Sequence, residues 1–304
     1  MIEISNLKKS FGNVTALDGL SFKAAPGAAF GLLGRNGAGK TTCIRILMNI
    51  FPPDSGGALI FGKSPGENTK KIGYLPEERG LYPKKTIIDQ MVYFGQLRGM
   101  RAQRAKKNAL LLLERLEAAE YANKKLDTLS KGNQQKIQLA ITLLCEPEII
   151  ILDEPFSGLD PVNAQILKDI VKEEVKKGCT VIFSSHQMSA VEEFCDEICI
   201  IDKGAVRLAG NLRDIKKSYP RDNIYVECEN EAADLAAALN DVSWIKKISP
   251  KGCGFIVNLN EGREPNSLLG AIINKKIGLS AFYVAEPSLE QIFVEKVGQT
   301  HGTV

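Results

Sequence analysis

Short apolar runs alternate with stretches of helical periodicity over roughly the first 210 residues, which is typical of an α/β domain with a largely parallel sheet. In such a domain each helix returns the chain to the start of the next strand. The sequence predicts strands over Ile2–Leu7, Ala29–Leu33, Ile72–Leu75, Ile149–Leu152, Val181–Ser184 and Ile198–Ile201.

A long segment between the third and fourth predicted strands has the period of a helix. We expect two helices there, over Ile87–Gly99 and Arg101–Ala119. Leu110, Leu113 and Leu116 recur at near-turn spacing among Lys and Arg residues, so the second helix has one apolar stripe and a solvated charged face. The segment therefore predicts a helical subdomain at about residues 85–145 within the α/β domain.

The pattern changes after Ser218-Tyr219-Pro220, where shorter elements follow in the order βαββαβ. That order suggests a small α+β domain of ferredoxin-like fold. No catalytic cluster lies in this part, so we interpret it as a regulatory, dimerising or docking module rather than a second active site. The predicted elements are the strand Asn223–Cys228, the helix Glu231–Leu239, the strand pair Trp244–Ile248 and Phe255–Leu259, the helix Ser267–Asn274, the strand Leu279–Val284 and a final helix Ser288–Val297.

The composition is that of an ordinary globular protein with room for two domains: 304 residues, of which 44% are hydrophobic and 25% are charged. The net charge of +3 is too small to indicate nucleic acid as a partner. No stretch approaches about 18 consecutive apolar residues and the start lacks the layout of a signal peptide, so we expect a cytosolic protein. The 7 cysteines form no C-x-x-C pair and there are 2 histidines, which disfavours a disulfide framework or a His-based zinc centre.

An octapeptide between a predicted strand and a predicted helix carries the clearest chemistry. Gly34-Arg35-Asn36-Gly37-Ala38-Gly39-Lys40-Thr41 fits the phosphate-loop pattern G-x-x-x-x-G-K-[ST]. Its glycines let backbone N–H groups approach a polyphosphate, and the following helix directs its positive end at the same charge. Lys40 is expected on the β- and γ-phosphates and Thr41 on Mg²⁺. The pattern predicts a site for a nucleoside triphosphate.

A second signal is a hydrophobic strand that ends in two acids, Asp153 and Glu154. At such a strand end the first acid can hold the Mg²⁺ shell and the second can polarise an attacking water. Acidic strand ends are common, so the pair gains its weight from three other motifs in a fixed order. These are Leu129–Gln135 before the acidic strand, Ser157–Asp160 just after it and Ser184-Ser185-His186 after the next strand.

With these motifs in this order, the chain resembles the ATP-binding subunits of ABC transporters over roughly residues 1–215. The resemblance implies a P-loop NTPase fold of ABC type. It also implies nucleotide contacts from Gly34, Asn36, Gly37, Ala38, Gly39, Lys40, Thr41 and Thr42, with Asp153 near Mg²⁺ and Glu154 as the catalytic glutamate.

The resemblance assigns the remaining motifs as well. Leu129–Asn133 matches the signature sequence, which makes Ser130, Gly132 and Asn133 nucleotide contacts. Asp160 matches the D-loop aspartate and His186 the switch histidine that senses the γ-phosphate. Phe11 stands where the family stacks an aromatic ring on adenine, although an aromatic residue considered alone is more often a packing residue.

Two positions depart from the family pattern. The signature, typically Leu-Ser-Gly-Gly-Gln, reads Leu-Ser-Lys-Gly-Asn here, which keeps Ser130 and Gly132 and adds the charge of Lys131. Glu77 stands where the family usually has the Q-loop glutamine. A carboxylate can also reach Mg²⁺ or its waters, so Glu77 is a candidate contact of both nucleotide and metal. Both variants resemble the branch that includes bacterial sodium and drug exporters.

The resemblance implies ATP and Mg²⁺ as cofactors and a head-to-tail dimer, of two copies or of one copy with a similar subunit. Each ATP would lie between the phosphate loop of one subunit and the signature of the other. A separate transmembrane permease would dock on the segment from Glu77 through 87–121, and hold the chain at the cytoplasmic face of the membrane. The ending Glu286–Phe293 resembles the appended domain of exporter subunits and favours export. We therefore expect an ATP-binding domain over 1–215 and an accessory domain over 221–300.

Two other functions stay open at the level of sequence. A non-transport ABC ATPase acting on nucleic acid or the ribosome usually carries a coiled-coil insertion, zinc-binding cysteines or two ATP-binding domains, and none is visible here. A nucleotide-binding regulator without turnover conflicts with the intact pair Asp153-Glu154. The transported molecule cannot be inferred from any residue of this chain.

Overall fold

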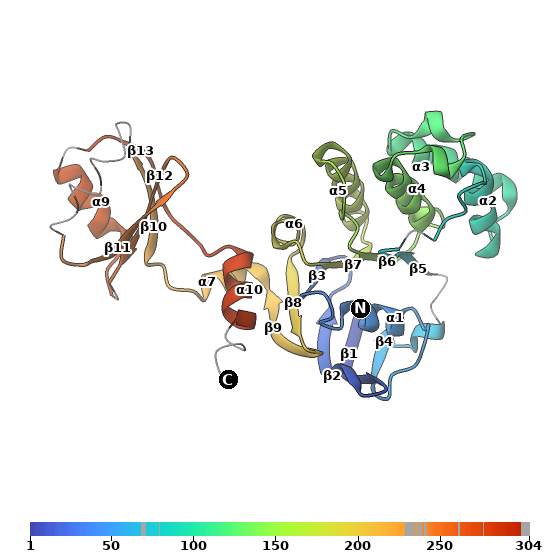
Figure 1. The fold of residues 1–304 in the computed structure, drawn as a ribbon, viewed down its shortest axis with the longest axis horizontal. Helices are drawn as coiled ribbons and strands as arrows, with labels where there is room; N and C mark the ends of the chain where they lie inside the picture. The colour runs from blue at the N-terminus through green and yellow to red at the C-terminus, as the bar shows by residue number, and fades with distance from the viewer. Residues whose placement is uncertain are drawn as a thin grey trace. The chain divides into compact units, whose positions relative to one another are not determined.

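The computed structural model of the chain divides into two compact units. The first, the N-terminal unit, comprises residues 1–212 and the described residues from 292 onward; the second, the C-terminal unit, comprises residues 213–291 (Figure 1). The structure describes residues 1–67, 71–78, 80–228, 235, 239, 242–260, 262–275 and 277–298.

A six-stranded sheet forms the centre of the N-terminal unit. Its strand order is β5-β6-β7-β3-β8-β9, and every pair is parallel except β8 with β9. Strands β3, β6 and β7 are buried along their whole length, as expected for strands covered on both faces. The strands are β3 (Ala29–Leu33), β5 (Ile72–Leu75), β6 (Ile149–Asp153), β7 (Thr180–Ser185), β8 (Glu197–Asp202) and β9 (Ala205–Asn211).

A separate antiparallel sheet of three strands, in the order β2-β1-β4, completes the β-structure of this unit. The strands are β1 (Ile2–Phe11), β2 (Val14–Ala24) and β4 (Ser55–Ile60). The prediction captured only the first half of β1. The register of β1 against β2 shifts between Ile4 and Leu7 and again before Lys9, so the period of two that marks a strand is interrupted.

Three helices, α2 (Ile87–Leu97), α3 (Ala102–Arg115) and α4 (Lys131–Leu143), gather beside one another, and α4 also packs on β5 (Figure 1). The hydroxyl of Thr86 accepts a hydrogen bond from the Asp89 amide and begins α2. The predicted stripe of α3 needs a correction, because Leu110 is 45% exposed while Leu112 and Leu113 are buried. A repeat of three residues drifts around a helix with 3.6 residues per turn.

The other helices of the N-terminal unit connect its strands. No helix among the described ranges has the length and apolarity that a membrane crossing requires. The connecting helices are α1 (Lys40–Leu47), α5 (Pro161–Lys176) and α6 (Met188–Phe194), and the unit also has the short 3₁₀ turns η1 (Pro65–Glu67), η3 (Ala119–Tyr121) and η4 (Leu126–Thr128). The helices α7 (Leu212–Lys217) and α10 (Leu289–Gly298) each contain residues of both units.

The C-terminal unit is an antiparallel sheet with strand order β11-β12-β10-β13. This strand order, with α9 between β12 and β13, agrees with the predicted ferredoxin-like fold. The helix predicted over 231–239 falls outside the described residues except for Leu235 and Leu239, which are buried in the core. The described elements are β10 (Asn223–Cys228), β11 (Ile245–Lys251), β12 (Gly254–Leu259), α9 (Pro265–Asn274) and β13 (Leu279–Val284).

Candidate functional site

The phosphate loop joins β3 to α1 and forms the floor of a cavity of about 330 Å³. Gly39 adopts a φ of 110°, and a Cβ there would stand 2.6 Å from the Ala16 carbonyl oxygen. Only glycine fits this position, because both the backbone angle and the space exclude a side chain. The cavity is lined by Val14, Thr15, Ala16, Arg35, Asn36, Gly37, Ala38, Gly39, Lys40, Thr41, Thr42, Glu77, Asp153 and Glu154.

Lys40, the first residue of α1, is 6% exposed and points back across the loop. Its Nζ donates a hydrogen bond of 2.7 Å to the Gly34 carbonyl and lies 3.6 Å from Glu154 Oε1. A buried ammonium requires such partners. The same position places Lys40 in the lining of the cavity, where its ammonium could contact a phosphate.

The two acids at the end of β6 are held by two serines at the end of β7. Ser184 is in register with Asp153 and donates a 2.5 Å hydrogen bond to its Oδ1. Ser185 donates a 3.2 Å hydrogen bond to Glu154 Oε2. The other oxygen of each acid, Asp153 Oδ2 and Glu154 Oε1, is buried and accepts no hydrogen bond from the described residues.

Burial also affects the ionisation of the Asp153 carboxyl, because the residue is only 1% exposed. Desolvation raises the pKa of its carboxyl, and contacts with the hydroxyls of Ser184 and Thr41 oppose that rise. The nearby negative charge of Glu154 adds to the rise, and the positive charge of Lys40 counteracts it. A cation brought into the cavity would therefore stabilise the ionised form.

Glu154 is held in an unusual backbone conformation with a φ of 50°. Its amide donates a 3.0 Å hydrogen bond to the Ser184 carbonyl, which stabilises the turn that follows β6. His186 Nδ1 lies 2.9 Å from Glu154 Oε1. A non-glycine residue with positive φ costs of order 1 kcal/mol or more and is most common at functional sites. The strand end thus fixes the Glu154 carboxylate between Lys40 and His186.

Glu77 reaches the same cavity from the segment after β5. Gln138 of α4 supports this segment, because its Nε2 donates hydrogen bonds to the carbonyls of Pro76 (3.1 Å) and Glu78 (3.4 Å). Glu77, Thr41 and Asp153 are among the residues whose side-chain oxygens line the cavity. No group of three or more His, Cys, Asp or Glu among the described residues could hold a metal ion by itself.

The signature and D-loop residues lie at helix starts away from this cavity. Ser130 caps α4, with its Oγ accepting a 3.3 Å hydrogen bond from the Asn133 amide. Asp160 caps α5 by accepting a 3.0 Å hydrogen bond from the Asn163 amide. Gly132 lies against Asn163, so the two caps are neighbours. Ser130, Gly132, Asn133 and Asp160 do not line the phosphate-loop cavity.

Phe11 also lies apart from the cavity lining. Its ring is 49% exposed and makes an edge contact with Phe51, with 5.4 Å between the ring centroids. Lys9 Nζ lies 5.6 Å from both rings. An exposed ring of this kind offers a flat apolar face, and its contact with adenine stays a prediction.

Several residues at the site were not singled out from the sequence as site residues. They include Ser184 and Ser185, the loop Val14–Ala16 and Gln135, whose Nε2 donates a 3.1 Å hydrogen bond to the Pro155 carbonyl. The pairing of β6 with β7 places the serines opposite the acids, and this pairing is not visible in a single sequence. The adjacency of both serines to His186 was the available signal.

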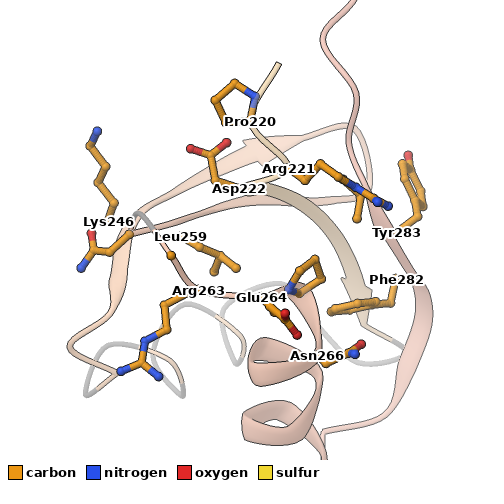
Figure 2. A pocket seen from close by; sticks show the side chains of 14 residues that line it. Pro220, Arg221, Asp222, Lys246, Leu259, Arg263, Glu264, Asn266, Phe282 and Tyr283 are labelled. Atoms are coloured by element: carbon orange, nitrogen blue, oxygen red, sulfur yellow. The ribbon is translucent and has the colours of Figure 1, made fainter. Parts of the chain in front are cut away.

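A larger hollow of about 900 Å³ lies in the C-terminal unit. Figure 2 shows that the charged ends of Arg221, Lys246 and Arg263 point in three different directions and do not converge on one point. Leu259 is buried, but all three basic residues are exposed. Convergent, partly buried polar groups mark a binding site better than volume does. The chemistry of the chain is therefore concentrated at the smaller cavity.

Two protein-family models match the chain. The model described as "ABC transporter" covers residues 17–157, which include the phosphate loop and the acidic pair. The model described as "ATP-binding protein DrrA1-3-like, C-terminal domain" covers residues 210–297.

Known proteins are similar over nearly the whole length. The uncharacterized ABC transporter ATP-binding protein YhaQ of Bacillus subtilis is 41% identical, covering 99% of this chain and 100% of the relative. Linearmycin resistance ATP-binding protein LnrL of the same organism is 33% identical over 99% of both chains. The dimeric structure of MJ0796, a bacterial ABC transporter cassette, matches with a TM-score of 0.65 and 25% identity, covering 70% of this chain and 99% of that one.

Proposed function

This chain belongs to the ABC transporter family and is one of its ATP-binding, ATP-hydrolysing subunits, and from that premise we propose that it hydrolyses ATP at a site shared by two subunits to drive export through a separate membrane permease. The resistance protein named above, similar from end to end, supports export. The full-length match to transporter subunits favours transport over action on nucleic acid or the ribosome.

One observation carries the catalytic part of the proposal: Glu154 Oε1 is buried beside the phosphate loop and accepts no hydrogen bond from the described residues. A general base needs a free oxygen within reach of the water that it activates. Lys40 and His186 lie 3.6 Å and 2.9 Å from that oxygen and keep it next to positive or proton-bearing groups. Glu154 is therefore the residue that receives the proton of the attacking water.

Mg²⁺ fits the residues present. Asp153 Oδ2 is a buried carboxylate oxygen without a hydrogen-bond partner among the described residues, and oxygen ligands of this kind suit a hard cation. Thr41 and Glu77 supply further oxygens on the same wall. Mg²⁺ usually completes its shell with water and substrate phosphates, so three protein donors are enough. When bound, the ion neutralises charge on the β- and γ-phosphates.

The protein groups divide the remaining work. The phosphate loop presents its backbone N–H groups and Lys40 to the β- and γ-phosphates, as the positive end of α1 does. Glu154 orients the water and takes its proton as the water attacks the γ-phosphate. His186 holds Nδ1 2.9 Å from Glu154 Oε1 and has its other ring nitrogen for the phosphate. Phe11 is proposed to contact the adenine.

Ser130, Gly132, Asn133 and Asp160 complete the site from a second subunit in this proposal. The support is their location, because these residues lie outside the cavity that holds the phosphate loop of their own chain. Ser130 offers its hydroxyl and Gly132 a bare backbone to the γ-phosphate of the partner's ATP. ATP then joins the two subunits, and its hydrolysis separates them. The dimer drives a permease that docks on the segment from Glu77 through 87–121, which holds the chain at the cytoplasmic face of the membrane.

The substitution Glu154→Gln tests the proposal. It removes the base while keeping the shape of the side chain, so ATP binding should persist, dimers should accumulate with ATP and turnover should fall at least about 100-fold. Phosphate release measures turnover, and size-exclusion chromatography with ATP measures the dimer. Glu148→Gln, an exposed acid just before β6, is the matched control and should hydrolyse ATP normally. Normal turnover of the Glu154→Gln protein would remove Glu154 from its proposed role.

A further inference from the structure

We propose that Ser185 is a positioning residue for hydrolysis, which binds one oxygen of Glu154 and so leaves the other as the base. This inference rests on the proposed function, because it assigns Ser185 a role only through Glu154. Its hydroxyl lies 3.2 Å from Glu154 Oε2, and both side chains are almost fully buried, at 3% and 6% exposure.

The hydrogen-bond network fixes the direction of the Ser185 proton. The Gln187 amide donates a 2.9 Å hydrogen bond to Ser185 Oγ, so this oxygen already serves as an acceptor. A hydroxyl has only one proton to donate. That proton is directed to Glu154 Oε2, the polar neighbour to which the structure shows Ser185 Oγ donating. Ser185 therefore links the start of α6 to the carboxylate.

This contact distinguishes the two oxygens of Glu154. Oε2 accepts the hydrogen bond of the Ser185 hydroxyl, whereas Oε1 accepts no hydrogen bond from the described residues and lies 2.9 Å from His186 Nδ1 and 3.6 Å from Lys40 Nζ. Contacts at Oε1 alone do not fix the terminal torsion of the carboxylate, because that torsion is broad. The Ser185 hydrogen bond holds the plane of the carboxylate, so that Oε1 stays directed at the phosphate side of the cavity.

Ser184 has a different task, although it is adjacent. Its hydroxyl bonds Asp153 Oδ1 and leaves Asp153 Oδ2 unbonded. Consecutive residues of a strand point to opposite faces, so Ser184 and Ser185 contact different acids at the neighbouring strand end. Ser184 therefore orients Asp153, and Ser185 orients Glu154.

Ser185→Ala in the full chain tests this inference. Loss of the orienting bond should lower kcat roughly 10- to 100-fold, as expected when a reacting group is misplaced, and leave the KM for ATP and equilibrium ATP binding unchanged. Ser185→Thr keeps the hydroxyl and should restore most of the turnover. Ser189→Ala, at an exposed serine of α6, is the matched control and should retain the normal kcat. If Ser185→Ala fails to fold, the nearly isosteric Ser185→Cys replaces it and must meet the same criteria.

Coupling to Glu154 separates this role from a structural one. In a Glu154→Gln background, Ser185→Ala should not lower the residual rate further, because the serine acts through that carboxylate. A normal kcat for Ser185→Ala beside an inactive Glu154→Gln protein overturns the inference and leaves the proposed function intact. Parallel loss of ATP binding and kcat without rescue by Ser185→Thr also overturns it. Normal turnover of Glu154→Gln overturns both proposals.

Discussion

The functional side chains around the phosphate loop are buried and contact one another, whereas Ser130 of the signature and Asp160 of the D-loop are exposed. Lys40, Glu154 and Ser185 are all at most 6% exposed and contact one another through defined hydrogen bonds or charge contacts. Ser130 and Asp160 are exposed, and each accepts a hydrogen bond from a backbone amide at the start of its own helix. The first region is assembled within one chain, and the second consists of polar residues on the surface of the chain.

This difference teaches where a second subunit is needed. A buried charge must be balanced within the chain, because an unpaired one is costly, so the base and the lysine are positioned before any ligand arrives. The exposed N-cap residues Ser130 and Asp160 have no such requirement, and their helix starts can still bind a phosphate held by another subunit. We therefore expect substitutions in the first region to affect ATP binding, the chemical step or folding within one chain, and substitutions in the second to affect only steps that need two subunits.

The largest effect is expected for Lys40→Met. It removes the cation proposed to face the β- and γ-phosphates and leaves Glu154 with His186 as its nearest proton-bearing group. ATP affinity should fall about 100-fold, which corresponds to about 2.7 kcal/mol. Equilibrium binding of a fluorescent ATP analogue measures the change. Arg45→Met, on an exposed position of the same helix, is the control and should bind normally. Unchanged affinity of Lys40→Met would place the phosphates elsewhere.

Ser130→Asp should abolish turnover while a single chain still binds ATP. Aspartate is as good an N-cap as serine, so α4 keeps its start, but in the proposed dimer the new charge would face the partner's γ-phosphate. We expect at least about 100-fold slower phosphate release and no ATP-dependent dimer, since like charges at an interface cost several kcal/mol. Ser130→Thr retains cap and hydroxyl and should stay active. An active Ser130→Asp protein would show that the signature does not meet the phosphate.

Local motifs made the phosphate loop, Asp153 and Glu154 predictable, because each is a short run of sequence beside one strand. The contacts of Ser184 and Ser185 were not predictable, since they depend on β7 lying next to β6, a pairing between residues 31 positions apart. Strand β2 was missed because register shifts disturb its alternation. The motifs identify which residues take part, and the sheet order decides which of them touch.

A matched pair of glycines should separate strain from function. In Gly39→Ala the new Cβ meets the Ala16 carbonyl at 2.6 Å with φ at 110°, so the protein should lose about 2 kcal/mol of stability. In Gly132→Ala the obstacle is the flexible amide of Asn163 at 2.8 Å, and alanine favours the helix. That variant should fold normally with reduced turnover. Differential scanning calorimetry and phosphate release distinguish the two; equal melting temperatures would contradict the contrast.

The smallest effect on the ATP site is expected from the core of the C-terminal unit. Ile272 is 0% exposed in that core, so Ile272→Ala should cost about 2–5 kcal/mol there, while the adjacent Ile273→Ala, at a position 61% exposed, should cost little. ATP affinity should stay normal in both, because the phosphate-loop cavity is lined only by residues of the N-terminal unit. Calorimetry would then record the loss in one transition only. If Ile272→Ala also weakens ATP binding, the two units are energetically coupled. The phosphate-loop region would then depend on the C-terminal unit and could not be regarded as assembled by the N-terminal unit alone.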